Sequence, residues 1–314
     1  MRILFAGTPA IAVPTLVQVA RHFEVAAVLT NTDKKGARGR RLVPSPVKEA
    51  AQELGIDVIQ FNRLGKDARE AVAPYACDTL LCFAYGRIFG PKFLSLFSGE
   101  KLNIHPSLLP DLRGPSPIQG AILNQLQRSG ISIQRLALEM DSGEVVKTLP
   151  FDLTGEETVT TLTERVAQLA APLAVEALKE IAGGTARFIA QKGEPTYTTL
   201  IDPSMAKLDF SLSAKTLHAQ IRAMQGWPKA QTQYDGQLLY LTAVYGPLSE
   251  AGSDPVETGV APGTVIARNK QKGVGIATGD GVLWVTGLQL ESRKELDALS
   301  FLNGNQRFLH STLG

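Results

Sequence analysis

Two polar side chains near the end of one apolar run are suited to acyl-group chemistry. Asn103 and His105 lie two residues apart in the run Lys-Leu-Asn-Ile-His, residues 101–105. Because side chains alternate across a β-strand, both would point to the same face. An amide N–H beside an imidazole N–H could donate hydrogen bonds to one developing oxyanion. The same groups could instead satisfy buried backbone atoms in a turn, and the spacing alone favours neither interpretation.

A later segment could supply a carboxylate to this pair. Asp141 lies in Met-Asp-Ser-Gly-Glu, soon after the apolar run 130–138. A carboxylate there could hydrogen-bond His105 and select its tautomer, or shuttle a proton. Asp-Ser-Gly is also a common turn sequence, so the spacing alone favours a turn residue over a catalytic one.

The segment after His105 is rich in proline. Residues 106–117 hold four prolines, each of which fixes its own φ and restricts the residue before it. Such a loop presents backbone N–H and C=O groups in a preset array, which could bind the edge of a flat heterocycle. A purely structural loop is the alternative.

A basic segment, residues 34–41, follows the apolar run 24–30. Its five basic residues are Lys34, Lys35, Arg38, Arg40 and Arg41. Basic runs are usually solvated loops, yet a mobile basic insertion at the end of a strand could hold a phosphate backbone.

Other common sites are excluded by their patterns. Residues 5–9, Phe-Ala-Gly-Thr-Pro, lack both the G-x-G-x-x-G dinucleotide motif and a following GK[ST], so no nucleotide cofactor is expected there. The remaining histidines, His22, His218 and His310, have no ligand neighbours at metal-binding spacing.

The elements that must position these groups alternate between strand and helix. Apolar runs predict buried strands, and Ser45 followed by Pro46 predicts the start of a helix. The expected strands are 2–7, 24–30, 57–61, 78–84 and 101–105, and the expected helices are 10–22, 45–54, 65–73 and 115–127. This alternation predicts a doubly wound parallel α/β sheet, whose ligands bind at the carboxyl ends of the strands.

The pattern changes in the second half of the chain. Residues 156–182 predict a long helix, kinked or broken at Pro172 and ended by Gly183 and Gly184. Short strands with Asp-Gly turns then predict a small OB-like β-barrel. We expect a catalytic domain over 1–188, a linker over 189–206 and a C-terminal domain over 207–314.

Composition sets the broad class. The chain has 314 residues, 44% hydrophobic and 20% charged, which is ordinary for a globular protein of two domains. The spacing of Cys77 and Cys82 fits neither a CxxC motif nor a zinc pattern, so we expect buried thiols in a reducing compartment. No signal peptide or membrane span is expected, and we predict a cytoplasmic monomer.

The motif Leu-Asn-Ile-His-Pro-Ser-Leu-Leu-Pro, residues 102–110, with the following Arg-Gly and Pro-Ile, resembles the signature of folate-dependent formyltransferases. Residues 140–144 are similar to the Asp-Thr-Gly segment of that family. The stretches 37–51 and 208–228 resemble the members that act on charged initiator tRNA. The resemblance runs from residue 2 to about residue 310.

The resemblance implies a Rossmann-like α/β first domain, a reaction and a site. The donor would be 10-formyltetrahydrofolate, without a metal, and the acceptor the α-amine of methionine on initiator tRNA, for translation initiation. Asn103 and His105 would hold the oxyanion, while His105 and Asp141 would handle the proton of the amine. The folate would bind at Ser107, Leu108, Leu109 and Pro110 and at Tyr85, Gly86, Arg87 and Ile88. Arg38 would approach the acceptor end of the tRNA, and the C-terminal domain would contact the tRNA.

Departures and alternatives accompany this prediction. Pro106, Glu139 and Leu200 stand where the family usually has other residues, and Glu139 leaves the path of the loop with Asp141 open. A sugar-nucleotide N-formyltransferase would use the same three residues, but would have no use for the basic segment. A formyltetrahydrofolate hydrolase or a non-catalytic tRNA-binding protein are further alternatives.

Overall fold

The computed structural model describes residues 1–36 and 42–314 and divides into two compact units. The first unit comprises residues 1–117, 129–151 and 163–198. The second comprises residues 118–128, 152–162 and 199–314, so it includes two stretches from the part of the chain expected to form the first domain. Each unit has its own buried apolar core.

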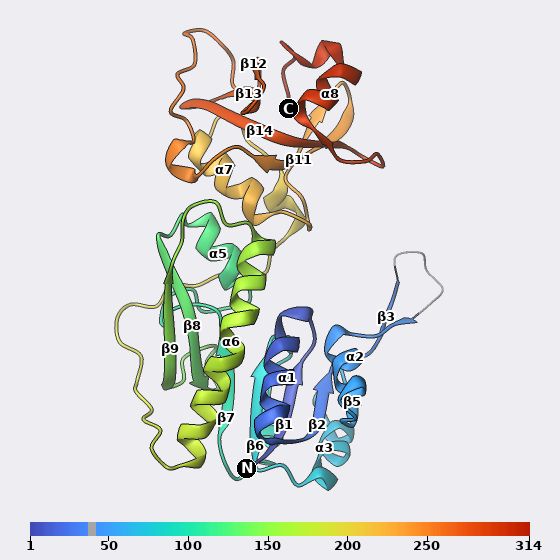
Figure 1. Ribbon diagram of the computed structural model, residues 1–314, viewed down its shortest axis with the longest axis vertical. Helices are drawn as coiled ribbons and strands as arrows, with labels where there is room; N and C mark the ends of the chain where they lie inside the picture. The colour runs from blue at the N-terminus through green and yellow to red at the C-terminus, as the bar shows by residue number, and fades with distance from the viewer. Residues whose placement is uncertain (37–41) are drawn as a thin grey trace. The chain divides into compact units, whose positions relative to one another are not determined.

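A seven-stranded sheet forms the centre of the first unit, in the order β5-β2-β1-β6-β7-β8-β9 (Figure 1). Its strands are β1 (Arg2–Gly7), β2 (Glu24–Thr30), β5 (Val58–Gln60), β6 (Thr79–Phe83), β7 (Lys101–His105), β8 (Arg128–Arg135) and β9 (Val145–Asp152). The strands from β5 to β7 pair in parallel, as predicted. The carboxyl ends of β6 and β7 therefore lie beside each other at one edge.

The prediction of a parallel sheet is wrong at β8, which runs antiparallel to β7, with His105 opposite Ser132 and Leu102 opposite Arg135. A parallel crossover needs a helix long enough to return the chain along the sheet. The connection from β7 to β8 consists of the proline-rich loop and α5 (Pro117–Leu123), and seven helical residues span only about 10 Å. The chain therefore re-enters the sheet at the carboxyl end of β7.

Helices cover both faces of the sheet. They are α1 (Val13–His22), α2 (Pro46–Glu53), α3 (Lys66–Val72) and α4 (Pro91–Leu94). Leu4 of β1 lies in a buried cluster with Val72 of α3 and Phe93 of α4. The next residue, Phe5, is equally buried and points to the opposite face by strand alternation. The crossovers through α1 and α2 run across the sheet toward β5, whereas the crossover through α3 runs the opposite way, toward β6. Because such crossovers are right-handed, α1 and α2 lie on the face to which Phe5 points.

Local signals in the sequence are confirmed at several element ends. Ser45 Oγ accepts a hydrogen bond from Lys48 N at 3.1 Å, so Ser45 caps α2 as predicted. Cys77 and Cys82 are free, buried thiols, as expected. The helix α6 (Val159–Ala182) is continuous through Pro172, so of the predicted kink or break the break is absent.

Residues 189–198, called here the return segment, are hydrogen-bonded to other parts of the first unit. Ile189 pairs with Val145 and Tyr197 with Arg113 in isolated bridges. The amide of Arg113 donates to the carbonyl of Thr196 at 2.9 Å, and the amide of Thr198 donates to the carbonyl of Arg113 at 2.7 Å. This half of the expected linker thus lies against the proline-rich loop.

The second unit is built on an antiparallel sheet in the order β10-β11-β14-β13-β12, with β15 paired to β14. Its elements are α7 (Ala214–Ala223), β10 (Gln231–Tyr234), β11 (Gln237–Val244), β12 (Val265–Asn269), β13 (Gly273–Thr278), β14 (Gly281–Leu290), β15 (Leu296–Asp297) and α8 (Ala298–Gly304). Asp235 and Gly236 have positive φ and close the two-residue turn between β10 and β11, as predicted. Within the described residues the strand order is open at β10 and β12.

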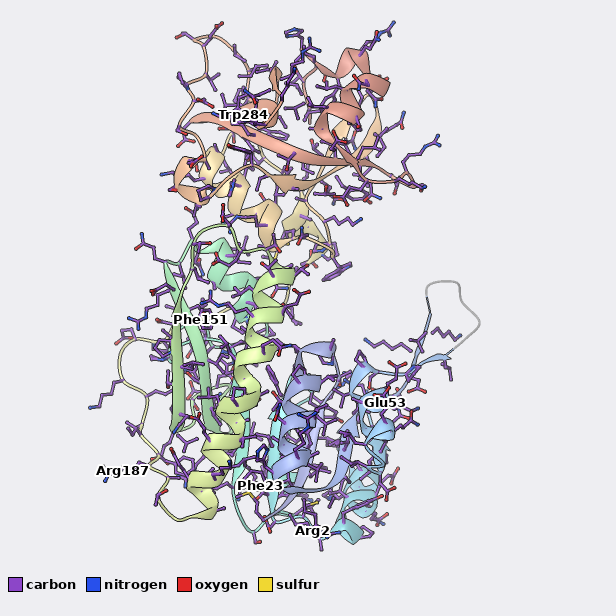
Figure 2. The ribbon with its side chains drawn as sticks, in the orientation of Figure 1. Arg2, Phe23, Glu53, Phe151, Arg187 and Trp284 are labelled. Atoms are coloured by element: carbon purple, nitrogen blue, oxygen red, sulfur yellow. The ribbon has the colours of Figure 1, made fainter. Side chains whose placement is uncertain are left out.

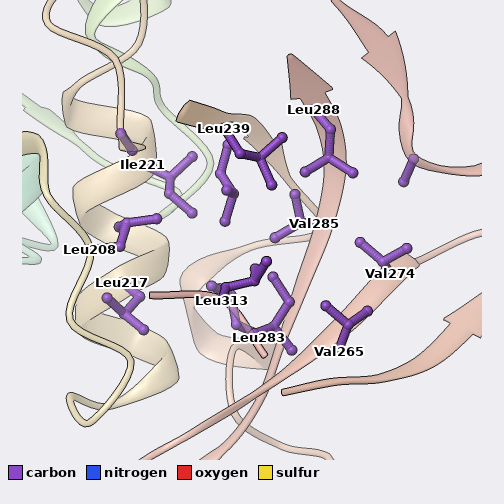
Figure 3. Close-up of a cluster of buried hydrophobic side chains, with 14 of the residues drawn as sticks. Leu208, Leu217, Ile221, Leu239, Val265, Val274, Leu283, Val285, Leu288 and Leu313 are labelled. Carbon is purple, nitrogen blue, oxygen red and sulfur yellow. The ribbon is translucent and has the colours of Figure 1, made fainter. Parts of the chain in front are cut away.

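One face of this sheet packs against helices to form the core of the second unit. Leu217 and Ile221 of α7 meet Leu239, Val285 and other strand residues (Figure 3). Trp284 on β14 (Figure 2) donates its Nε1–H to Asp254 at 2.6 Å, which ties the loop before β12 to the sheet.

The remaining short elements are the strands β3 (Lys34–Lys35) and β4 (Leu42–Val43) and 3-10 turns at Ala10–Ala12, Ala73–Tyr75, Pro203–Ala206, Leu248–Glu250 and Gln306–Phe308. Across residues 1–36 and 42–314, none of the helices combines the length and the apolar character needed to span a membrane.

Candidate active site

Strand β7 places Asn103 and His105 on one face of the sheet, as the spacing predicted. A third predicted residue, Asp141, contacts both from the loop between β8 and β9. Asn103 Nδ2 lies 3.4 Å from Asp141 Oδ1, and His105 Nδ1 lies 3.6 Å from Asp141 Oδ2. The three residues predicted to be catalytic are therefore brought together, across 38 residues of sequence between Asn103 and Asp141.

The hydrogen bonds of His105 determine which ring nitrogen is basic. His105 Nε2 lies 2.9 Å from the carbonyl oxygen of Leu112. A carbonyl only accepts, so Nε2 carries the hydrogen and the neutral ring keeps its lone pair on Nδ1, facing Asp141. Burial lowers the pKa of His105, and it outweighs the opposing effects of the Asp141 carboxylate and the Leu112 carbonyl. The ring is thus a neutral base near pH 7.

The carboxylate of Asp141 is held by donors on both of its oxygens. Gln134 Nε2 donates to Oδ1 at 2.8 Å, and the backbone N–H of Gly114 donates to Oδ2 at 2.9 Å. Asp141 itself has a left-handed backbone, with φ +52°. The second bond joins the proline-rich loop to the loop of Asp141, so the two loops hold each other in place.

The segment predicted to bind folate after β7 is a tightly bonded turn. Ser107 is buried; its carbonyl accepts from Ser132 Oγ at 2.8 Å, and the same hydroxyl accepts from Leu109 N at 3.1 Å. The carbonyl of Leu108 accepts from Asp111 N at 2.9 Å. Leu108, Leu109 and Pro110 are half-buried, and the Leu109–Pro110 bond is cis.

The second predicted folate segment follows the neighbouring strand β6. Tyr85 is buried, and its hydroxyl donates to the carbonyl of Phe61 at 2.6 Å, so this side chain anchors the loop in the core. Gly86 has φ +75°, and Arg87 Nε donates to Asn31 Oδ1 at 2.8 Å. Ile88 is 87% exposed at the loop surface.

The predicted tRNA-binding residues are only partly described. Lys34 and Lys35 form the short strand β3, paired with β4, and both side chains are exposed. Arg38, Arg40 and Arg41 lie outside the described residues. In the described chain, no three His, Cys, Asp or Glu side chains are grouped so that they could hold a metal ion.

Sequence reasoning missed the residues that support Asp141. Gln134 lies directly opposite Asn103 across β7 and β8, and it is almost fully buried. The sequence does show Gln134 as a polar residue inside the apolar run 130–138. Its partner could not be predicted, because the pairing depends on the antiparallel register of β7 and β8. Arg113 and Gln191 were missed for a similar reason, because they meet across 78 residues of sequence.

Comparisons with known proteins find relatives over nearly the whole chain. A family model described as formyl transferase matches residues 1–178, and one described as formyl transferase, C-terminal domain, matches residues 200–306. The methionyl-tRNA formyltransferase of Borrelia duttonii is 35% identical, and that of Lachnospira eligens 36%; each alignment covers 98% of this chain and 97% of the relative.

A solved structure gives the same fold. The N-formyltransferase from Helicobacter canadensis, in complex with folinic acid and dTDP-3-aminofucose, matches with a TM-score of 0.64 at 18% identity. The match covers 94% of this chain and 99% of that chain. At this identity the likeness concerns the fold alone.

Proposed function

The chain belongs to the methionyl-tRNA formyltransferase family, and we propose that it transfers the formyl group of 10-formyltetrahydrofolate to the α-amine of methionine on initiator tRNA. The observation that carries the proposal is the contact between Asn103 and His105, on one face of β7, and Asp141, on the loop between β8 and β9. It joins a neutral base, an amide donor and a carboxylate within 3.6 Å contacts. An acyl transfer to an amine needs these three functions.

The proposed mechanism begins with attack of the amine nitrogen on the formyl carbon. The formyl oxygen becomes an oxyanion, for which the Asn103 amide is the donor, since its long contact to Asp141 uses only one of two hydrogens. One such donor is typically worth about 3 kcal/mol. His105 Nδ1 accepts the proton of the attacking nitrogen, and the Asp141 carboxylate stabilises the resulting imidazolium.

Protonation gives His105 its second role. Once Nδ1 carries a hydrogen it becomes a donor, whereas in the neutral ring Nδ1 can only accept. The bond between the formyl carbon and N10 of the folate then breaks, and the proton goes to N10. His105 therefore acts as base first and as hydrogen-bond donor afterwards, and it returns to the neutral form.

The loops at the ends of β6 and β7 are the proposed folate site. Residues 85–88 and 107–110 follow two adjacent parallel strands, and ligands of open α/β sheets bind at such an edge. The basic segment, from Lys34 and Lys35 through Arg38 to Arg40 and Arg41, is the proposed contact for the tRNA backbone.

The second unit is proposed to add a further tRNA contact, with an OB-like arrangement of its strands. The proposed functional division is the one expected from the sequence: 1–188 for catalysis, 189–206 for the linker and 207–314 for the tRNA-binding domain. It differs from the compact units, the first of which includes residues 189–198. We infer a monomer that works in the cytoplasm, where charged initiator tRNA and reduced folate meet.

A formylation assay tests the proposal. The chain is mixed with 10-formyltetrahydrofolate and methionyl-initiator tRNA, and formyl-methionine and free formate are both followed. Transfer that requires charged tRNA supports the proposal. Formate release at the same rate without tRNA would identify a hydrolase, and formylation only of an aminated sugar nucleotide would identify a sugar N-formyltransferase.

The basic segment is tested in the same assay. Arg38→Ala should raise the KM for tRNA while the KM for folate stays unchanged, because the lost contact is to phosphate. An unchanged KM for tRNA would remove the basic segment from the proposed tRNA site.

A further inference from the structure

The return segment carries a side chain that reaches the loop of Asp141. Gln191 Nε2 donates to the carbonyl oxygens of Asp141 at 2.7 Å and of Gly143 at 2.8 Å. On its other side, Gln191 Oε1 accepts from Arg113 Nη2 at 2.8 Å and from Nε at 3.2 Å. The amide is therefore bonded at both ends.

The orientation of this amide follows from its partners. A guanidinium only donates, so the atom that faces Arg113 must be Oε1, and backbone carbonyls only accept, so the other atom must be Nε2. The same reasoning orients Gln134, whose Nε2 faces the carboxylate of Asp141 at 2.8 Å and whose Oε1 lies 3.3 Å from Gln191 Nε2. One polar chain thus runs from Arg113 through two glutamines to the carboxylate.

The loop of Asp141 needs such external support. Asp141 has a left-handed backbone, a conformation that residues other than glycine rarely adopt. Leu138 is 82% exposed and Met140 is 55% exposed, so the loop buries little apolar surface of its own. Arg113, by contrast, is 8% exposed, and its backbone is hydrogen-bonded to the return segment. Its position is therefore fixed, and it can hold the Gln191 amide in place.

We propose that Gln191 is a positioning residue for formyl transfer: its two bonds to backbone carbonyls set where the Asp141 carboxylate stands against His105 Nδ1. The inference rests on the proposed function. It extends the catalytic unit to a residue 50 positions beyond Asp141, in a segment that the sequence predicts to be a linker.

The test compares two variants with a control on the same segment. Gln191→Met keeps the size but removes both hydrogen-bonding ends, and Gln191→Glu keeps the acceptor for Arg113 but removes the donor. Lys192→Ala is the matched control, since Lys192 is the exposed neighbour. Both Gln191 variants should lower kcat by roughly 10- to 100-fold, with the KM values for folate and tRNA within about twofold of the unchanged protein. Lys192→Ala should behave as the unchanged protein.

Folding and mechanism are separated by two further measurements. Thermal melting identifies a variant that fails to fold. If Gln191→Met is unfolded, the test uses Gln191→Glu, which keeps the hydrogen bond from Arg113. In an Asp141→Asn background, Gln191→Met should change the single-turnover rate by less than about twofold, because its effect passes through the carboxylate. A full additional loss there, an unchanged kcat, or a change confined to KM for tRNA would overturn the proposal. If Asp141→Asn alone were fully active, the proposed catalytic role of Asp141 would fail instead.

Discussion

Replacing Asp141 with asparagine separates the charge of this side chain from its shape. The carboxylate accepts from Gln134 Nε2 at one oxygen and from Gly114 N at the other. In asparagine one of these positions becomes an NH2 group, which faces a donor whichever way the amide turns. The substitution thus removes the charge beside His105 and breaks one of two charge-assisted hydrogen bonds.

The two consequences have different sizes. A hydrogen bond to a charged group contributes about 1.5–3 kcal/mol, so the free energy of unfolding should fall by about 2 kcal/mol. Loss of positioned proton handling typically costs roughly 10²- to 10⁴-fold in rate, or about 3–5 kcal/mol in the activation barrier. The rate should therefore fall much further than the stability.

The assay is single-turnover formylation at saturating folate and charged tRNA, with thermal melting in parallel. Glu139→Gln is the control, because it removes a charge from the same loop at a side chain that is 70% exposed and 3.5 Å from Arg113. It should change the rate by less than about twofold, as exposed ion pairs contribute little. A folded Asp141→Asn variant with a rate within about threefold of the unchanged protein would refute the proton-handling role. An equal loss of rate in Glu139→Gln would show that the total charge of the loop matters, rather than the position of the Asp141 carboxylate.

Three further predictions address the donor, the loop and acid stability. Asn103→Ala should lower kcat by roughly 100-fold while thermal stability changes little, since it removes an oxyanion donor. Gly143→Ala should destabilise by about 1–3 kcal/mol in denaturant unfolding, because a Cβ there would lie 1.9 Å from the carbonyl oxygen of Arg135, whereas Gly304→Ala, in α8 with nothing within 4 Å, should not. Burial, reinforced by the Arg222 charge, lowers the pKa of His218 to about 4 from 6.5. As the pH falls from 6.5 to 4, His218 is therefore protonated in the unfolded chain before it is protonated in the folded one. The free energy of unfolding should decrease by about 3 kcal/mol over that window. His218→Gln should remove this part of the pH dependence.

The candidate site was predictable where its residues lie close in sequence. Asn103 and His105 share a strand face because of a period of two, which is a local property of the backbone. The first two strands, residues 2–7 and 24–30, appear with the predicted bounds, and Ser45 caps α2. The folate and tRNA residues outside the strands stay predictions, which the proposed assays address.

The fold was less predictable where a long-range pairing decides it. The antiparallel direction of β8 places Gln134 opposite Asn103, and a parallel strand would have given it another partner. Nothing near Gln191 in the sequence indicates that its amide binds the loop of Asp141. A side chain's neighbours across tens of residues follow from the topology of the chain, which local periodicity does not encode.

The types of elements and the polar pair on β7 could be predicted from the sequence, because turn chemistry and alternation act within a few residues. The motifs in the sequence also indicated the family to which the chain is similar. How these groups work together depends on contacts that the folded chain makes. The Leu112 carbonyl selects the tautomer of His105 and leaves Nδ1 free to face Asp141. Gly114, Gln134 and Gln191 hold that aspartate in place from three separate segments. The physical reason is that hydrogen-bond partners in a buried site are set by position in space, and position requires the whole first unit to be folded.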